Sequence, residues 1–137
     1  MSQDSNARRN MTVVGNLTAD PDLRYTPSGK AVAKFGLAVN KGHKDGDKWV
    51  EEAPEFWNIS VWEDQGEHVA ESLHKGDRVT VYGRREEARE YERQDGSTGS
   101  ADHDISAYEV SASLRYATAQ VQRAERSTAR EGAGIAN

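Results

Sequence analysis

The sequence predicts an all-β domain, a small closed barrel of five strands with one short helix. Several short segments alternate apolar and polar residues, as strands with one buried face do. Only one segment has the spacing of an amphipathic helix. With 137 residues, the chain is long enough for one domain with a genuine core.

Composition excludes several classes of site. The chain contains no cysteine, so disulfides, thiolate zinc sites and cysteine nucleophiles are excluded. No apolar run approaches the length of a membrane span, so we expect a soluble, cytoplasmic protein. The net charge of −5 alone argues against a nucleic-acid binder. However, eight basic residues face five acidic ones through residue 50, whereas residues 51–76 hold seven acidic residues and one basic residue.

The first predicted strand is the β-branched segment 11–17, in which Gly15 indicates a bulge or a close approach of another backbone. Two turn signals follow within residues 18–29, where we expect no strand. Residues 30–40 alternate clearly and form the second strand. One of its faces is apolar and the other is small and partly basic, with Val32, Lys34, Gly36, Ala38 and Asn40. Such a face suits an extended polyanion, although alternation of this kind usually marks a solvated surface.

Residues 41–54 are rich in glycine and charge, so we expect a flexible hairpin tip carrying one aromatic side chain, Trp49. The third strand, residues 55–62, follows. One of its faces carries Trp57, Ile59 and Val61 and is predicted to be core. The other carries Phe56, Asn58, Ser60 and Trp62, on which unpaired bases could stack. Burial on both sides and a subunit interface are the alternatives for this strand.

The helix is predicted over residues 64–75. Asp64 and Glu67 have capping-box spacing, Lys75 falls in the last turn and Gly76 ends the helix. A fourth strand over residues 78–84 follows, with Val79, Val81 and Gly83 facing inward. The remaining elements are a charged hairpin arm over residues 85–99, a weaker fifth strand over 101–110 and a tail.

Five strands, one helix between the third and fourth and an extended hairpin between the fourth and fifth match the OB-fold, a Greek-key barrel. This fold binds oligonucleotides and oligosaccharides on its second and third strands. Here those are the small, partly basic strand and the aromatic strand. The fold and the two faces therefore both favour a nucleic-acid binder, the former by analogy only.

The chain also resembles bacterial single-stranded DNA-binding proteins. Their opening is similar to residues 12–21 (TVVGNLTADP), 23–25 (LRY) and 29–33 (GKAVA). The likeness continues through residues 69–79 (VAESLHKGDRV), 81–84 (VYGR) and 113–119 (SLRYATA), the last being similar to actinobacterial members. The resemblance implies a binding domain over residues 11–119, a disordered lead-in at 1–10 and a flexible tail at 120–137.

The resemblance implies non-catalytic, sequence-tolerant binding of single-stranded DNA during replication, recombination or repair, by a nucleoid-associated homotetramer without a cofactor. Its base-stacking aromatics fall on Phe56, Trp62 and Tyr91, with Trp49 in a loop where the family often places another. Asn58, which stands where the family can carry arginine, is also expected to contact DNA. The basic residues expected to contact phosphates are Arg8, Arg9, Lys34, Lys75, Arg84, Arg89 and Arg93.

The sequence departs from the family's pattern in three features. Besides Asn58, four glutamates dilute the charged arm, and the chain ends without the acidic, phenylalanine-tipped peptide that recruits enzymes in replicative members. Recruitment by such a tip is therefore doubtful, and a specialised paralogue or a phage-encoded version is expected.

The alternative functions are a protein-interaction or primosome-type module and a nuclease. The sequence argues against a nuclease because the four histidines lack metal-ligand spacing. Alternation also places His103 on the opposite face from Asp102 and Asp104, so these three residues are not expected to act together.

Overall fold

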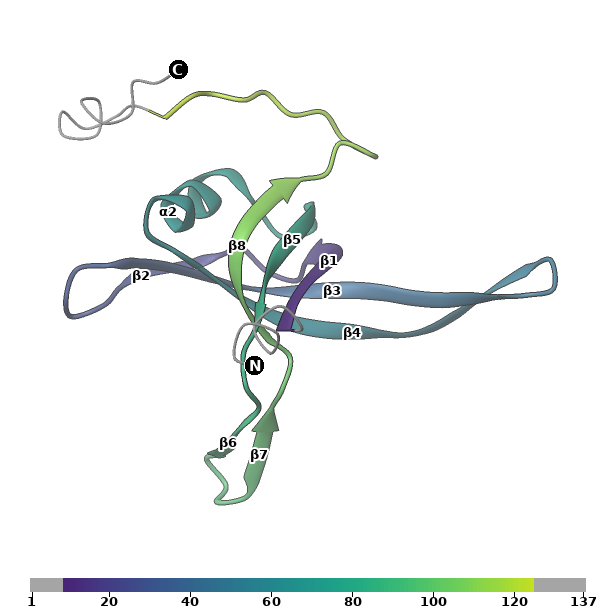
Figure 1. Cartoon of the computed structure of the whole chain (residues 1–137), viewed down its shortest axis with the longest axis horizontal. Helices are drawn as coiled ribbons and strands as arrows, with labels where there is room; N and C mark the ends of the chain where they lie inside the picture. Colours follow the sequence, from purple (N-terminus) through teal and green to yellow (C-terminus); the bar gives the residue numbers. More distant parts are fainter. Residues whose placement is uncertain (1–8, 125–137) are drawn as a thin grey trace.

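A computed structural model describes residues 9–124 of the protein, which form a barrel with two projecting hairpins (Figure 1). The elements in chain order are β1 (Asn10–Leu17), β2 (Asp22–Tyr25), β3 (Ala31–Asp45), β4 (Lys48–Trp62), α2 (Glu63–Ser72), β5 (Arg78–Arg85), β6 (Arg89–Glu92), β7 (Thr98–Ala101) and β8 (Asp104–Ala112). Among these residues no helix is long and apolar enough to cross a membrane.

Five strands close into a ring. The main sheet has the order β1-β5-β8-β4-β3-β2, and β1 also pairs with β3. All of these pairings are antiparallel except that of β4 with β8. At the closing point a Cβ on Gly15 would collide with the carbonyl oxygen of Ala38, so the expected close backbone approach is confirmed. The predicted OB-fold barrel, with its helix after the aromatic strand, is confirmed.

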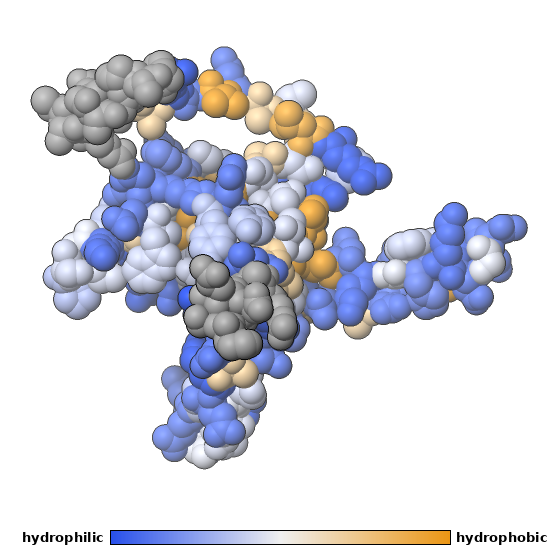
Figure 2. Space-filling model, viewed as in Figure 1, coloured by the Kyte–Doolittle hydropathy of each residue, from blue (hydrophilic) through white to orange (hydrophobic). Residues whose placement is uncertain are grey.

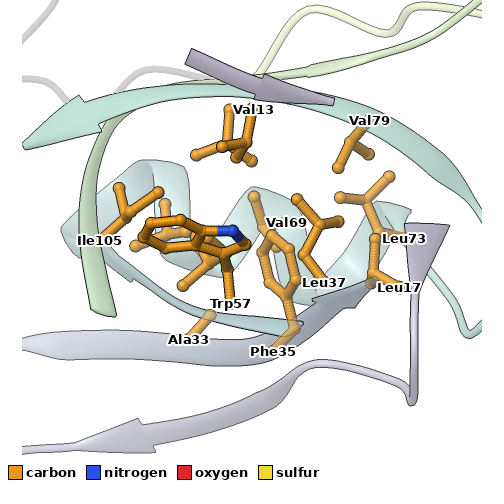
Figure 3. Packing of buried hydrophobic residues seen from close by; sticks show 13 residues of the cluster. Val13, Leu17, Ala33, Phe35, Leu37, Trp57, Val69, Leu73, Val79 and Ile105 are labelled. Carbon is orange, nitrogen blue, oxygen red and sulfur yellow. The ribbon is translucent and has the colours of Figure 1, made fainter. Parts of the chain in front are cut away.

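The core lies inside this ring, between the strands and α2 (Figure 3). Trp57, Ile59 and Val61 of β4 are all buried, as predicted from alternation. Val32 is also buried, although alternation places it on the outer face. Its partners in the ladders are Arg24 of β2 and Trp62 of β4, which flank it on that face. The unpredicted strand β2 thus covers part of the surface next to Trp62.

The expected hairpin tip lies within residues 41–54, but the expectation of a loop over this whole stretch is wrong. β3 and β4 continue as a two-stranded ribbon that projects from the barrel (Figure 1), and only Gly46 and Asp47 form the turn. Gly46 has a φ of 67°, the left-handed conformation that two-residue hairpin turns need at their first position. Backbone pairing holds the ribbon together, so neither of its faces needs the apolar alternation that indicates a strand.

The helix boundaries also differ from the prediction. α2 begins at Glu63 and has no side-chain cap, so the capping-box interpretation is wrong. It ends at Ser72, before Lys75 and Gly76. The backbone N–H groups of the following turn have other acceptors: that of His74 donates to Asp77 Oδ2, and that of Lys75 donates to Asp20 Oδ1. These bonds hold the chain in a turn where the helix was expected to continue.

Candidate functional site

The outer faces of β3 and β4 form one continuous surface, called here the groove face. In the ladder Ala38 lies opposite Phe56, Gly36 opposite Asn58, Lys34 opposite Ser60 and Val32 opposite Trp62. The two faces singled out in the sequence therefore lie side by side. Their aromatic members are solvent-accessible, Phe56 at 61% and Trp62 at 41%. Burial of β4 on both sides is excluded.

The spacing along β4 suits an extended ligand. Phe56 and Trp62 are six residues apart, about 20 Å in a strand that rises about 3.3 Å per residue. Small side chains lie between them. A Cβ at Gly36 would lie 2.5 Å from Thr18 Oγ1, so the Thr18 side chain covers this part of the surface and glycine leaves it room. The result is a floor of small residues with an aromatic ring at each end.

A groove of about 760 Å³ follows this floor from Asn58 to Trp62, whereas Phe56 lies outside its lining. Strand β8 supplies one wall, because its parallel pairing places Asp104 beside Asn58 and Ser106 beside Ser60. The Asn58 side chain donates from Nδ2 to Asp104 Oδ1 at 2.9 Å. The base of the arm supplies Glu86 and Arg89. Sequence reasoning missed Asp104, Ser106 and Glu86 as site residues, since only the pairing of distant strands brings them to β4.

One row of side chains crosses the barrel at the centre of the groove face. Lys34 is paired with Ser60, Ser60 with Ser106 and Ser106 with Arg84, each on the neighbouring strand. Strands lie about 4.8 Å apart, so the row is about 14 Å long. Two predicted phosphate contacts therefore stand at the ends of a short line of hydroxyl groups.

The arm formed by β6 and β7 carries the third predicted aromatic. Tyr91 lies opposite Gly99, and its ring occupies the space a Cβ there would need. The guanidinium carbons of Arg89 and Arg93 lie 6.0 Å and 5.7 Å from the ring centroid, within cation–π range. Arg93 also donates to Ser97 and to the Thr98 carbonyl oxygen. Figure 2 shows that this arm and the ribbon have mainly hydrophilic surfaces.

The arm is anchored beside Trp57. Arg85 donates twice to the Asp102 carbonyl oxygen, at 3.1 Å and 2.8 Å, which joins the two ends of the arm. The guanidinium carbon of Arg85 lies 5.2 Å from the Trp57 ring centroid. The centroid of the His103 ring lies 4.3 Å from that of Trp57. Arg9, predicted to contact DNA, donates to the Arg85 carbonyl oxygen and pairs with Glu87. Arg9 thus lies at the base of the arm.

Two carboxylates near Trp57 have lowered pKa values. A hydrogen bond from the Trp57 indole, assisted by Lys41, lowers the pKa of Glu55. A hydrogen bond from His103 Nδ1 at 2.7 Å lowers the pKa of Asp102. The argument that alternation separates His103 from Asp102 is therefore wrong, because residues 102 and 103 lie outside the strands. Within residues 9–124 no three histidine, aspartate or glutamate side chains gather to hold a metal ion.

The remaining predicted residues lie outside the groove. Trp49 is 61% exposed on the ribbon, where its ring lies over Gly42. Lys75 is in the turn after α2. Arg8 lies outside the described residues, as does most of the predicted tail at 120–137. The described part of that tail, residues 120–124, is exposed and has neither helix nor strand.

Comparison with known proteins gives consistent matches. The model of the single-strand binding protein family matches residues 9–128. A single-stranded DNA-binding protein from Paenarthrobacter aurescens is 44% identical over 90% of this chain and 72% of its own length. One from Corynebacterium glutamicum is 44% identical over 85% of this chain, which spans 52% of that relative. The crystal structure of the small single-stranded DNA-binding protein from Streptomyces coelicolor has a TM-score of 0.68 and 27% identity, covering 77% of this chain and 94% of that one.

Proposed function

The chain belongs to the single-strand binding protein family, and on that premise we propose that it binds single-stranded DNA along the groove face. The observation that carries this proposal is the pair of exposed rings, Phe56 and Trp62, at the two ends of a floor of small residues. Unpaired bases of any sequence can stack on such rings, and each stacked base contributes about 1–3 kcal/mol of binding free energy. A duplex hides the base faces, so it cannot use this floor.

Basic side chains around the floor are proposed to hold the phosphates. Lys34 and Arg84 end the row that crosses the groove, while Arg89 and Arg93 flank Tyr91 on the arm. Contacts of this kind release counterions, so the affinity should fall steeply with salt. The role is one of binding without catalysis, serving replication, recombination or repair at the nucleoid.

We further propose that the protein assembles as a homo-oligomer, a homotetramer by resemblance to its family. Trp57 and Ile59 are buried in the core and unavailable to a second copy. A better surface is the outer side of β5 and β8, where the exposed Tyr82 and Tyr108 rings lie 5.5 Å apart. Sedimentation equilibrium of the protein and of Tyr82→Glu tests this, because a charge in the interface should shift the assembly towards monomers.

A paired titration tests the proposed function. Fluorescence anisotropy of a labelled oligo-dT and of a labelled duplex of equal length is followed at moderate salt. We expect the single strand to bind much more tightly. Equal affinity for both would contradict stacking as the mechanism. Absence of binding to either would favour a surface that meets another protein.

A further inference from the structure

A carboxylate lines one wall of the proposed DNA groove. Asp104 is the first residue of β8, and its side chain is 18% exposed. Its Oδ1 accepts the hydrogen bond from Asn58 Nδ2, and its Oδ2 lies 3.5 Å from Nη2 of Arg89. Asn58 and Arg89 are both residues expected to contact DNA. Asp104 therefore occupies the polar groups that a bound single strand would use.

The groove is electrically balanced by this arrangement. Its charged lining consists of two basic residues, Lys34 and Arg89, and two acidic residues, Glu86 and Asp104. A phosphate backbone entering the groove meets no net positive charge, and it meets a carboxylate beside one of the two cations. Arginine binds carboxylate and phosphate oxygens through the same planar set of donors. The same Arg89 can therefore serve either partner.

We propose that Asp104 is an internal competitor of the DNA backbone. In the free protein it holds Arg89 at the edge of the groove, and a phosphate takes over this arginine when a single strand binds. The Arg89 side chain is 64% exposed and that of Asp104 is 18% exposed, so solvent partly screens the pair and the exchange costs less than breaking a fully buried ion pair would. The competition lowers the affinity of the groove. This inference rests on the proposed function.

The test removes the charge while keeping the shape. Asp104→Asn retains an oxygen that can accept from Asn58. We expect it to bind an oligo-dT of about 16 nucleotides roughly three- to tenfold more tightly at 0.1 M salt, the scale of one partly exposed ion pair.

The matched control is Glu71→Gln. Glu71 is exposed on α2, away from both the groove lining and the proposed interface on β5 and β8. This variant makes the same change in net charge and should bind within about twofold of the wild type, since charges beyond a Debye length of about 10 Å are largely screened. An equal gain in both variants would show a general charge effect and overturn the proposal.

A double-mutant cycle separates competition from positioning. Arg89→Gln should weaken binding only slightly in the wild type, where Asp104 already engages Arg89, and should abolish the gain in the Asp104→Asn background. Weaker binding by Asp104→Asn, or equal effects of Arg89→Gln in both backgrounds, would show that Asp104 positions the arginine and would overturn the proposal. Thermal unfolding checks each variant. If Asp104→Asn does not fold, Asp104→Ser removes the same charge beside Ser106.

The outcome also distinguishes this inference from the proposed function. A wild-type protein that does not bind oligo-dT contradicts the proposed function itself. A wild-type protein that binds, with no gain in Asp104→Asn, contradicts only the role given to Asp104.

Discussion

Phe56 and Trp57 are adjacent on β4, yet 61% of the first and only 4% of the second is exposed. The two rings belong to opposite faces of one strand. Trp57 shares its face with Ile59 and Val61, which are buried, whereas Phe56 shares its face with Asn58 and Ser60. The neighbours two residues away, rather than the aromatic type itself, therefore distinguish a core ring from a ring of the proposed binding surface.

The two faces also differ in how their rings are held. Trp57 lies between the Arg85 guanidinium and the His103 ring, and its indole N–H donates to Glu55. Its surroundings are complete without a ligand. Phe56 and Trp62 have much of their surface open to solvent. The core face is therefore expected to control stability and the groove face to control binding, and each of the following variants tests this division.

The largest effect is expected at the core face. Trp57→Ala should lower the free energy of unfolding by about 3–5 kcal/mol, as the truncation of large buried aromatics does. Chemical denaturation measures this loss. Trp49→Ala on the ribbon is the control, because an exposed ring away from the core should change the same quantity by about 0.5 kcal/mol or less. A stable Trp57→Ala protein would contradict the assignment of the two faces.

The next effect is expected at the groove face. Phe56→Ala and Trp62→Ala should each weaken binding of oligo-dT by about 1–3 kcal/mol, the stacking energy of one base. Anisotropy titration measures the loss, and Trp62→Phe should recover part of it because a ring remains. Phe56→Ala should leave the unfolding free energy nearly unchanged. If Phe56→Ala lost stability and Trp57→Ala lost binding, the assignment of the core face and the groove face of β4 would be wrong.

A smaller effect is expected on the arm. Tyr91→Ala should weaken binding by about 1 kcal/mol, the lower end of the stacking range, because the ring already lies against Gly99 and two arginines. Tyr91→Phe should bind as the wild type does, since stacking does not need the hydroxyl group. The unfolding free energy should not change, because β6 and β7 form a sheet of their own. A marked loss of stability would show that the arm is part of the barrel core.

The smallest effect is expected on the stability of the fold at acidic pH. The pKa of Glu55 is lowered from its ordinary value of 4.5 and that of Asp102 from 3.8, so the folded state favours both charged forms. The stability they contribute is complete above those ordinary values and is lost as the pH falls through the lower folded values. We therefore expect the melting temperature to decline below about pH 4.5, with a shallower decline in Glu55→Gln. Equal acid slopes would contradict this.

The barrel could be predicted because its signals are local. Alternation along residues 30–40 and 55–62 gives the correct buried faces apart from Val32, since the period of a strand is two whatever its partners are. The ribbon could not be predicted in the same way. On its β3 side, from Lys41 to Asp45, every residue is polar or glycine, and backbone hydrogen bonds leave no trace in side-chain hydropathy.

The aromatic half of the candidate site was accessible to sequence reasoning, but its polar half was not. Phe56 and Trp62 could be identified because they lie on the same face of one strand. Asp104 reaches Asn58 from 46 residues away, through a parallel pairing of only three residue pairs. No local pattern signals such a contact. The same limit explains Arg9, whose role at the base of the arm depends on the carbonyl group of Arg85.

The parallel pairing of β4 with β8 also has a consequence for the order of folding. The β3–β4 hairpin closes through a two-residue turn, and hairpins form within about 1–10 μs. The β4–β8 contact must wait until α2, β5 and the arm have brought the chain back, because contacts distant in sequence form slowly. We therefore expect the longest hairpin to form early and the three-pair contact to be among the last. The groove would then exist only once nearly the whole described chain has folded.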